Sequence, residues 1–382
     1  MTGPASTPDS AADATTSGGA GHHRWSHLRW LVLVVGIAGV VLGSGALVVG
    51  CVLSGSTYSG PVSGHFDGKR FHNLRDVPHG GFGRFLKWRW ARRASPWSPR
   101  QNLAVDAMLP RVIRVGRGEL QLTFVNHATM LVQVDGLNVL TDPIWSERAS
   151  PVSFAGPRRY HPPGVRFEDL PPIDVVLISH SHYDHMDLPT LRRLEAAHHP
   201  QVVVGLGNGA VLRDAGLSRV SELDWWQSLP LAPEIRVTGV PSQHFSGRGL
   251  LDGDRTLWLG YVIEGPAGPT YFAGDTGAGP HFAQIRARFG RPRLALLPIG
   301  AYRPEWFMEA VHISPEQAVE ADEILGAGTA VAMHFGTFAL ADDGQDEPPV
   351  ELARALARRG PYSPNFWVPR PGERRVVPIL RP

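Results

Sequence analysis

An apolar strand that runs into a cluster of histidines is the feature that most constrains this chain. Asp174–Ser179 (DVVLIS) is apolar in the way of a strand covered on both faces. His180, His182, Asp184 and His185 follow directly, so four nitrogen and oxygen ligands lie within six residues. His180 and His182 project to one side of an extended chain, and a turn must then bring the other two to the same centre. The cluster suits zinc or a similar divalent ion better than a polar loop with unrelated histidines.

Three later apolar runs also end on a side chain that can bind a metal. His244 follows the run 235–240, Asp275 follows 270–273 and His334 follows 329–333, each beside small residues. Any one of them has an ordinary explanation as a turn residue or a core histidine. Because the same arrangement recurs three times, and small residues allow a close approach of the backbone, the sequence favours a shared site at several strand ends.

Strands interspersed with helices along the chain predict mixed sheets covered by helices. Further strands are expected at Glu119–Val125, Thr129–Val134, Leu137–Thr141, Gln201–Val204, Leu257–Ile263 and Leu294–Ile299, and helices at Leu188–Ala197, Pro280–Phe289 and Pro315–Leu325. The 43 Gly and 34 Pro among 382 residues argue against a helical bundle. The single Cys excludes an internal disulfide framework and a zinc site of several thiolates. A net charge of +2 argues against a nucleic-acid partner.

The N-terminal region predicts a membrane anchor. Leu31–Leu53 carries no charge and would form about 34 Å of helix, against a hydrocarbon core of roughly 30 Å. Arg24 and Arg29 precede it, so the positive-inside rule places the following domain on the extracytoplasmic side. Cys51, at the end of the sequence LVVGC, leaves lipidation as an alternative means of anchoring.

The same reading divides the chain into four parts. Residues 1–30 are expected to be a disordered tail with a basic flank, and 31–53 the anchor. Residues 54–64 (SGSTYSGPVSG) are expected to be a flexible linker. Residues 65–382 show no second linker and no repeat, and are expected to form one large domain.

These residues resemble the metallo-β-lactamase-fold hydrolases, in which HxHxDH is followed by a separate His, an Asp and a last His. Within that superfamily the chain is most similar to N-acylphosphatidylethanolamine-hydrolysing phospholipase D. The similarity covers most of the chain from about residue 65, and the stretches that carry it include Leu140–Ile144 (LTDPI), Glu222–Trp226 (ELDWW), Phe272–Gly277 (FAGDTG), Pro298–Tyr302 (PIGAY) and His334–Leu340 (HFGTFAL).

The resemblance implies an α/β fold of α+β type, the αββα sandwich, with two divalent ions, expected to be Zn2+, between the sheets. A hydroxide shared by the ions would attack the phosphorus of a phosphodiester. The implied ligands are His180, His182 and His244 for one ion, Asp184, His185 and His334 for the other, and Asp275 as the bridge.

The resemblance makes Asp184 and Asp275 catalytic as ligands, and a further group should assist the departing alkoxide. His312 is the best remaining candidate, because it precedes a helix N-terminus near a loop that the family places beside the site; a structural histidine is an equal alternative. His127 is predicted to support the site or the fold and not to bind an ion. Four other histidines are expected to be exposed to solvent: His161, His198, His199 and His281.

Gly83–Arg100 combines six cations with three Trp. A packing segment with a solvated face is the plainest interpretation. A lipid-interface patch ranks next and a nucleic-acid surface last.

Together these observations predict a membrane-anchored phosphodiesterase that acts on N-acylated or related glycerophospholipids. A lactonase or β-lactamase-like hydrolase on the same metal centre is one alternative, and a non-catalytic lipid-binding protein is another. The expected partners are a phospholipid substrate and the membrane, without nucleic acid, and the oligomeric state stays open, with a homodimer among the options.

Overall fold

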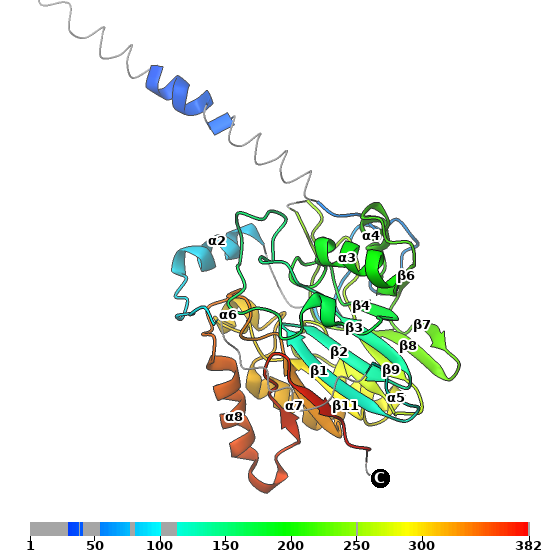
Figure 1. The fold of residues 1–382 in the computed structure, drawn as a ribbon. Coiled ribbons are helices and arrows are strands. Elements are labelled where there is room, and N and C mark those ends of the chain that lie inside the picture. Colours follow the sequence, from blue (N-terminus) through cyan, green and yellow to red (C-terminus); the bar gives the residue numbers. More distant parts are fainter. Residues whose placement is uncertain are drawn as a thin grey trace, which may run out of the picture. The chain divides into compact units, whose positions relative to one another are not determined.

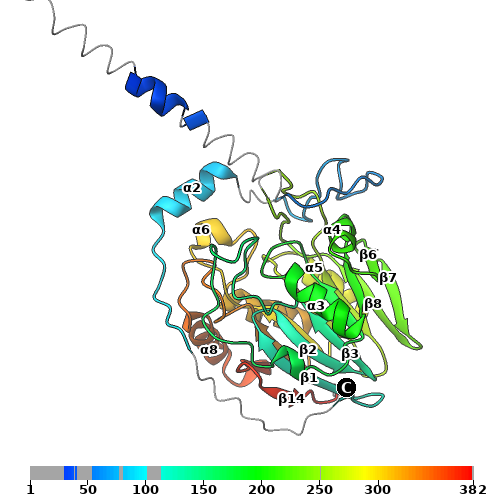
Figure 2. The same cartoon turned by 45° about the horizontal axis from the view of Figure 1, so that its top comes forward.

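The computed structural model describes residues 30–37, 39–40, 54–76, 81–100, 113–249 and 251–380. The chain divides into two compact units, Met1–Val52 and Leu53–Pro382. The second unit contains the predicted catalytic domain and is drawn in Figures 1 and 2.

The predicted single-pass anchor, and the membrane location derived from it, are wrong for the described residues. A helix covers residues 30–37 and 39–40. At 1.5 Å per residue its longer stretch reaches only about 12 Å, well short of a hydrocarbon core of roughly 30 Å. No helix in the described part of the chain is both long and apolar enough to span a membrane. Residues 41–53, with Cys51, and the tail 1–29 lie outside the described residues.

One seven-stranded sheet is formed by six strands from the N-terminal half of the large unit and by one late strand. Its strands in spatial order are β14 (Arg374–Val376), β1 (Leu120–Asn126), β2 (Thr129–Val134), β3 (Leu137–Thr141), β4 (Val175–Ile178), β5 (Gln201–Gly205) and β6 (Val220–Leu223). Pairing is antiparallel from β14 to β3 and parallel from β3 to β6.

The C-terminal half forms a second seven-stranded sheet. Its strands in spatial order are β13 (Phe366–Trp367), β12 (Thr329–Met333), β11 (Leu294–Pro298), β10 (Thr270–Phe272), β9 (Gly260–Glu264), β8 (Ile235–Val240) and β7 (Ser228–Ala232). Pairing is parallel from β13 to β10 and antiparallel from β10 to β7.

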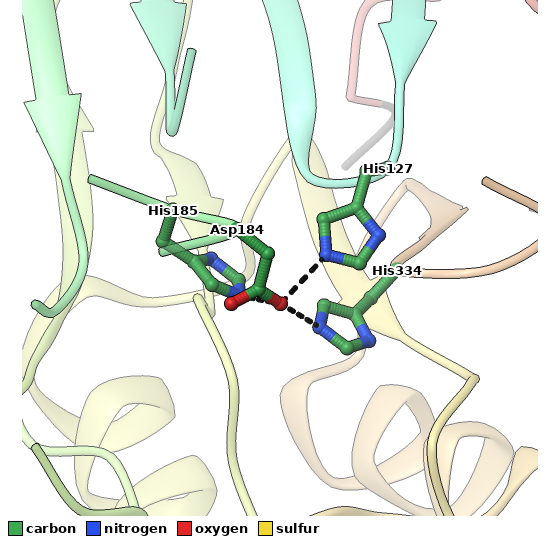
Figure 3. Close-up of side chains that lie close together, drawn as sticks. All are labelled: His127, Asp184, His185 and His334. Atoms are coloured by element: carbon green, nitrogen blue, oxygen red, sulfur yellow. Dashed lines mark hydrogen bonds and ion pairs between the residues drawn. The ribbon is translucent and has the colours of Figure 1, made fainter. Parts of the chain in front are cut away.

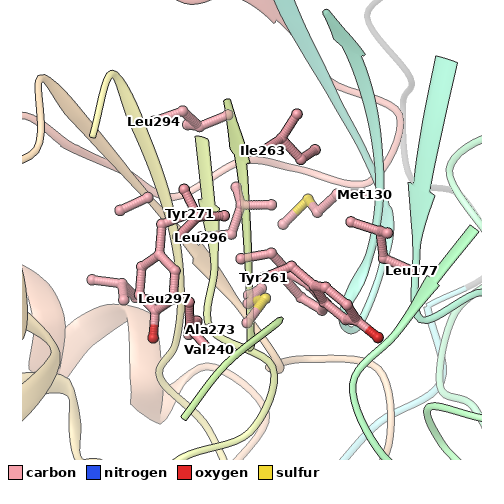
Figure 4. Packing of buried hydrophobic residues seen from close by; sticks show 14 of the residues in the cluster. Met130, Leu177, Val240, Tyr261, Ile263, Tyr271, Ala273, Leu294, Leu296 and Leu297 are labelled. Carbon is pink, nitrogen blue, oxygen red and sulfur yellow. The ribbon is translucent and has the colours of Figure 1, made fainter. Parts of the chain in front are cut away.

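The main hydrophobic core lies between the two sheets (Figure 4). Successive side chains of β4 point to opposite faces of the sheet, so both faces of this apolar strand are buried. Leu177 belongs to this core, whereas Ile178 belongs to the cluster under the outer helices. Tyr261 of β9 also links the sheets, because its hydroxyl donates to the carbonyl oxygens of Ile178 (2.8 Å) and Val203 (2.9 Å).

Helices cover the outer faces of both sheets (Figure 1). On the first sheet, α3 (Leu188–His198) and α4 (Gly209–Asp214) bury Leu191 and Leu212. On the second, α5 (His281–Phe289), α7 (Pro315–Leu325) and α8 (Glu347–Arg359) bury Ile285, Val319 and Leu352. The expected sandwich of helix, sheet, sheet and helix layers is therefore confirmed.

Several elements differ from the expectation. The run Leu257–Ile263 becomes a strand only at Gly260. Sequence patterns did not indicate the short helices α2 (Phe82–Ala91) and α6 (Glu305–Met308), helix α8, the strands β6, β7, β13 and β14, or the 3-10 turns Phe167–Asp169 and Gly360–Tyr362.

The segment 54–64, expected to be a flexible linker, makes specific contacts with the large unit. The backbone N–H of Gly55 donates to Asp252 (2.6 Å), and that of Tyr58 donates to the carbonyl oxygen of Arg255 (3.0 Å). The ring of Tyr58 packs edge-on against Phe66 at 4.9 Å.

Candidate metal centre

The candidate site lies where several strands of both sheets end. Strands β8, β10 and β12 run in the same direction, since β8 and β10 are both antiparallel to β9 and the pairs β10–β11 and β11–β12 are parallel. Their carboxyl ends therefore meet at one edge of the second sheet, which faces the carboxyl end of β4 in the first. The residues that follow these four strands include all seven predicted ligands.

Three imidazoles form the first group. His180 and His182 follow β4, and His244 follows β8. The Nδ1 atom of His182 lies 2.7 Å from Nε2 of His180 and 3.4 Å from Nε2 of His244. All three side chains are wholly or largely buried, so their nitrogens converge on a single point that a metal ion could occupy.

Two carboxylates and two imidazoles form the second group (Figure 3 shows three of them). Oδ2 of Asp184 lies 3.2 Å from Nε2 of His185 and 3.5 Å from Nε2 of His334. Oδ2 of Asp275 lies 3.2 Å and 3.0 Å from the same two nitrogens. A tetrahedral ion with ligands at 2.0–2.1 Å separates neighbouring ligand atoms by about 3.3 Å, so this spacing fits Zn2+.

Asp275 also lies toward the first group. Its Oδ2 atom is 3.8 Å from Nε2 of His244, and His180, His185 and Asp275 form a further set of mutually close ligand atoms. This position between the two groups is the one that a bridging ligand requires.

Unpaired polar atoms support the fit to metal ions. Among the described side chains, Nε2 of His185, Nε2 of His334 and Oδ1 of Asp275 are buried without a hydrogen-bond partner. Buried polar atoms in proteins are almost always paired, and unpaired ones cost about 1–3 kcal/mol each. Bound divalent ions would satisfy these atoms.

Buried partners orient the ligands from behind. Oδ2 of Asp142, just after β3, accepts from Nδ1 of His185 (2.6 Å) and from the hydroxyl of Ser179 (2.6 Å), while Oδ1 accepts from the backbone N–H of Ser179 (2.7 Å). Nδ1 of His244 donates to the carbonyl oxygen of Val311 (2.9 Å). Such partners fix which ring nitrogen faces the ion and raise the ligand's basicity. Asp142 was not identified from the sequence, although it follows an expected strand.

Electrostatics suit cations at this edge. Burial lowers the pKa of His180 and of His244 well below the usual value, and lowers the pKa of His182 to about 4, so these rings are neutral, as metal ligands must be. Burial opposes the ionisation of Asp275, but His185 and His334 outweigh it and hold the pKa of that carboxyl well below its usual range. Burial opposes the charged form of His334, yet Asp275 and Asp184 raise its pKa to about 9. The carboxylates thus demand positive charge, which a divalent ion would supply.

His127 and His312 complete the cluster. His127, in the turn between β1 and β2, lies with Nε2 3.0 Å from Oδ2 of Asp184 (Figure 3). Nδ1 of His312 lies 4.0 Å from Oδ2 of Asp275 and has no hydrogen-bond partner. Both predicted positions are therefore at the site. His127 also forms a set of mutually close ligand atoms with Asp184, His185 and His334, so it could itself bind an ion, and the supporting role predicted from the sequence stays a prediction.

The backbone turns sharply beside these side chains. His127, Asp142 and His334 have φ values of 48°, 32° and 59°, in the left-handed region that non-glycine residues rarely adopt. The carbonyl oxygen of His127 accepts from the backbone N–H of His334 (2.9 Å), which ties two of these turns together.

Two of the four histidines expected to be exposed are buried. Nε2 of His161 lies 3.0 Å from the hydroxyl of Thr337, and Nε2 of His281 lies 3.1 Å from that of Thr276. The partner of His161 comes from a distant segment, whereas that of His281 is only five residues away; both rings are buried by the surrounding fold, which the local pattern does not report. His199 is exposed and His198 is partly so.

Known proteins are similar to this chain along the same residues. A model of the beta-lactamase superfamily domain matches residues 137–335. An uncharacterized protein of Mycobacterium tuberculosis is 40% identical over 296 residues, 76% of this chain and 77% of that protein. N-acyl-phosphatidylethanolamine-hydrolyzing phospholipase D 1 of Caenorhabditis elegans is 39% identical over 227 residues, 56% of this chain and 64% of the worm protein. A solved metallo hydrolase of Ignicoccus hospitalis aligns with a TM-score of 0.51 and 25% identity, covering 68% of this chain and 98% of that one.

Proposed function

The chain belongs to the beta-lactamase superfamily and is a metal-dependent hydrolase of that fold, and from this premise we propose that it cleaves a phosphodiester bond of glycerophospholipids. We take N-acylphosphatidylethanolamine-like lipids as the substrate and a phospholipase D-type cut as the reaction. The observation that supports this most is the pair of adjoining ligand groups sharing Asp275, because a two-ion centre is suited to in-line displacement at phosphorus. The similarity to the worm phospholipase D supports the substrate class.

In this proposal water adds to phosphorus and the bond from phosphorus to the headgroup oxygen breaks. The products are phosphatidic acid and an N-acylethanolamine, whose oxygen takes up the proton. Two bound divalent ions would supply Lewis-acid activation of the phosphoryl group and of the water.

The protein's own groups have separate tasks. His180, His182 and His244 would hold one ion, and the four-ligand group the other. Burial lowers the pKa of His312 to about 4, so this ring is neutral at pH 7 and can donate one N–H hydrogen bond. Its nitrogen 4.0 Å from Asp275 places it to hold the leaving oxygen beside the centre.

Product analysis with the full-length, zinc-loaded chain tests the proposal. A mixture of N-acylphosphatidylethanolamine, phosphatidylcholine, a lactone panel and a β-lactam would be followed by mass spectrometry, with and without chelator. We expect chelator-sensitive release of phosphatidic acid from the N-acylated lipid. Asp275→Asn should lower this turnover by orders of magnitude while the chain stays folded by circular dichroism.

Other outcomes would contradict the proposal in different ways. Turnover confined to lactones or the β-lactam would replace the substrate class but keep the centre. Full metal occupancy without turnover of any phospholipid or carbonyl substrate would favour a non-catalytic lipid-binding protein.

A further inference from the structure

Helix α2 is held on the domain by one face only. On that face Trp88 is buried and stacks on Phe307 of α6, with ring centroids 5.4 Å apart and planes within 13°. The indole N–H of Trp88 donates to Asp342 (3.2 Å), and Arg92, just after the helix, forms an ion pair with the same carboxylate. Figure 2 shows α2 beside α6. These contacts give the helix a defined orientation.

The rest of the helix presents large apolar side chains to solvent, and one of them, Phe85, also contacts the Trp88 ring at 5.7 Å. Phe85 is 44% exposed, Leu86 48% and Trp90 95%. Positions 85, 86, 89 and 90 share one side of a helix because residues three and four apart lie in line. Trp306 of α6 is 39% exposed and lies beside cations of the helix, since its ring centroid is 5.8 Å from Arg84 and 5.0 Å from Lys87. Several large apolar side chains exposed on one helix mark an interaction site more often than a single exposed residue does.

Helix α2 itself carries cations and no acidic residue, whereas the exposed Glu305 and Glu309 flank Trp306 at α6. Residues 82–93 include Arg84, Lys87, Arg89 and Arg93 and no Asp or Glu. In the described structure neither Lys87 nor Arg89 has an ion-pair partner, while Lys87 lies over the Trp306 ring at 5.0 Å. The surface is therefore strongly cationic in a chain whose net charge is only +2.

We propose that α2 and Trp306 form a docking surface for an anionic phospholipid bilayer. This inference rests on the proposed function and names the partner that would present the substrate. The helix would lie in the headgroup layer, with Trp90, Phe85 and Leu86 reaching toward the acyl chains and the cations meeting lipid phosphates. Exposed Leu and Phe side chains favour this partner over a nucleic acid, which would offer them no apolar phase.

The surface is also close to the candidate centre through α6. Phe307, on which Trp88 stacks, belongs to this one-turn helix. The carbonyl oxygen of Met308 at its end accepts from the backbone N–H of His312 (2.9 Å). Helix α6, against which α2 packs, is therefore linked by one backbone hydrogen bond to a predicted catalytic residue.

Vesicle co-sedimentation of the full chain provides the test. Phosphatidylcholine vesicles with and without phosphatidylglycerol would be used, and Lys87→Ala/Arg89→Ala and Trp90→Ala would be compared with wild type. At roughly 5-fold per cation, the double variant should bind anionic vesicles about 30-fold more weakly. Lys69→Glu and Tyr362→Ala serve as matched controls, because both residues are exposed outside this surface and should leave binding unchanged.

Binding and turnover separate this inference from the proposed function. Vesicle binding needs no catalysis, so the binding experiment still tests the docking surface if the protein turns out not to hydrolyse phospholipids. If the proposal holds, the α2 variants should retain hydrolysis of a detergent-dispersed substrate and lose it on vesicles. The docking surface would be overturned if the α2 variants bound anionic vesicles as well as the wild type does. It would also be overturned if the two control variants lost as much vesicle binding as the α2 variants, or if the chain bound single-stranded DNA but not anionic vesicles.

Discussion

Removing the imidazole of His127 tests whether the turn between β1 and β2 helps to hold the metal. Nε2 of His127 lies 3.0 Å from Oδ2 of Asp184, and both side chains are buried. A hydrogen bond to a charged group contributes about 1.5–3 kcal/mol. If His127→Ala loses this amount mainly from the metal-bound state, zinc affinity at the second group should fall by about 10- to 150-fold. Loss of comparable outer hydrogen bonds typically costs 10–100-fold in metal affinity.

Competition with a chromophoric chelator measures this affinity, and elemental analysis gives the zinc content per chain. His127→Gln retains an N–H donor of similar reach, so it should recover part of the loss. His198→Ala removes another imidazole, one that is remote from all seven predicted ligands, and should bind zinc like the wild type. An affinity of His127→Ala within twofold of the wild-type value would refute the role assigned to this hydrogen bond.

Three further predictions concern stability. Burial raises the pKa of Asp322 to about 7, so between about pH 4 and 7 this carboxyl ionises only in the unfolded state, and the free energy of unfolding falls as pH rises. Asp322→Asn should remove this loss. In urea titrations the variant should gain up to about 4 kcal/mol above pH 7 and little at pH 4. Asp142→Asn replaces a carboxylate that accepts from Ser179 and His185 with an amide, in which one of the two acceptor oxygens becomes an NH2 donor. The change should lower the free energy of unfolding by about 3 kcal/mol and weaken zinc binding. Chelation should lower the melting temperature of the wild type, and excess zinc should restore it, because an ion that binds only the folded state stabilises that state.

Sequence patterns could predict the features that depend on local order. The apolar run before His180 correctly placed a buried strand, and the ends of similar runs placed His244, Asp275 and His334 near it in space, because parallel strands share an edge. Patterns failed where distant partners decide. His161 looked like a surface residue, yet it is buried and its ring lies 3.0 Å from the hydroxyl of Thr337, which belongs to a distant segment.

Other misses have similar causes. Helix α8 is a different case, because its prolines lie in the first turn and Val, Leu and Ala make up six of its thirteen residues, so the sequence did carry a helix signal there. Asp142 orients His185 because the loop after β4 lies beside the end of β3. The local sequence around Asp142 does not indicate this contact between two separate segments. The spanning helix was inferred from the length of the uncharged run Leu31–Leu53, but within the described residues the helix covers only 30–37 and 39–40.

The left-handed backbone at His127, Asp142 and His334 has a consequence for attempts to make the protein more heat-resistant. Each such conformation costs a non-glycine residue about 1 kcal/mol or more, so the three together are a noticeable fraction of a typical folding free energy of 5–15 kcal/mol. Glycine would relieve this backbone strain, but at Asp142 it would also remove the carboxylate that holds Ser179 and His185, a loss of about 3 kcal/mol that exceeds the relief. A more heat-resistant variant must therefore keep these three side chains and gain its stability elsewhere in the chain.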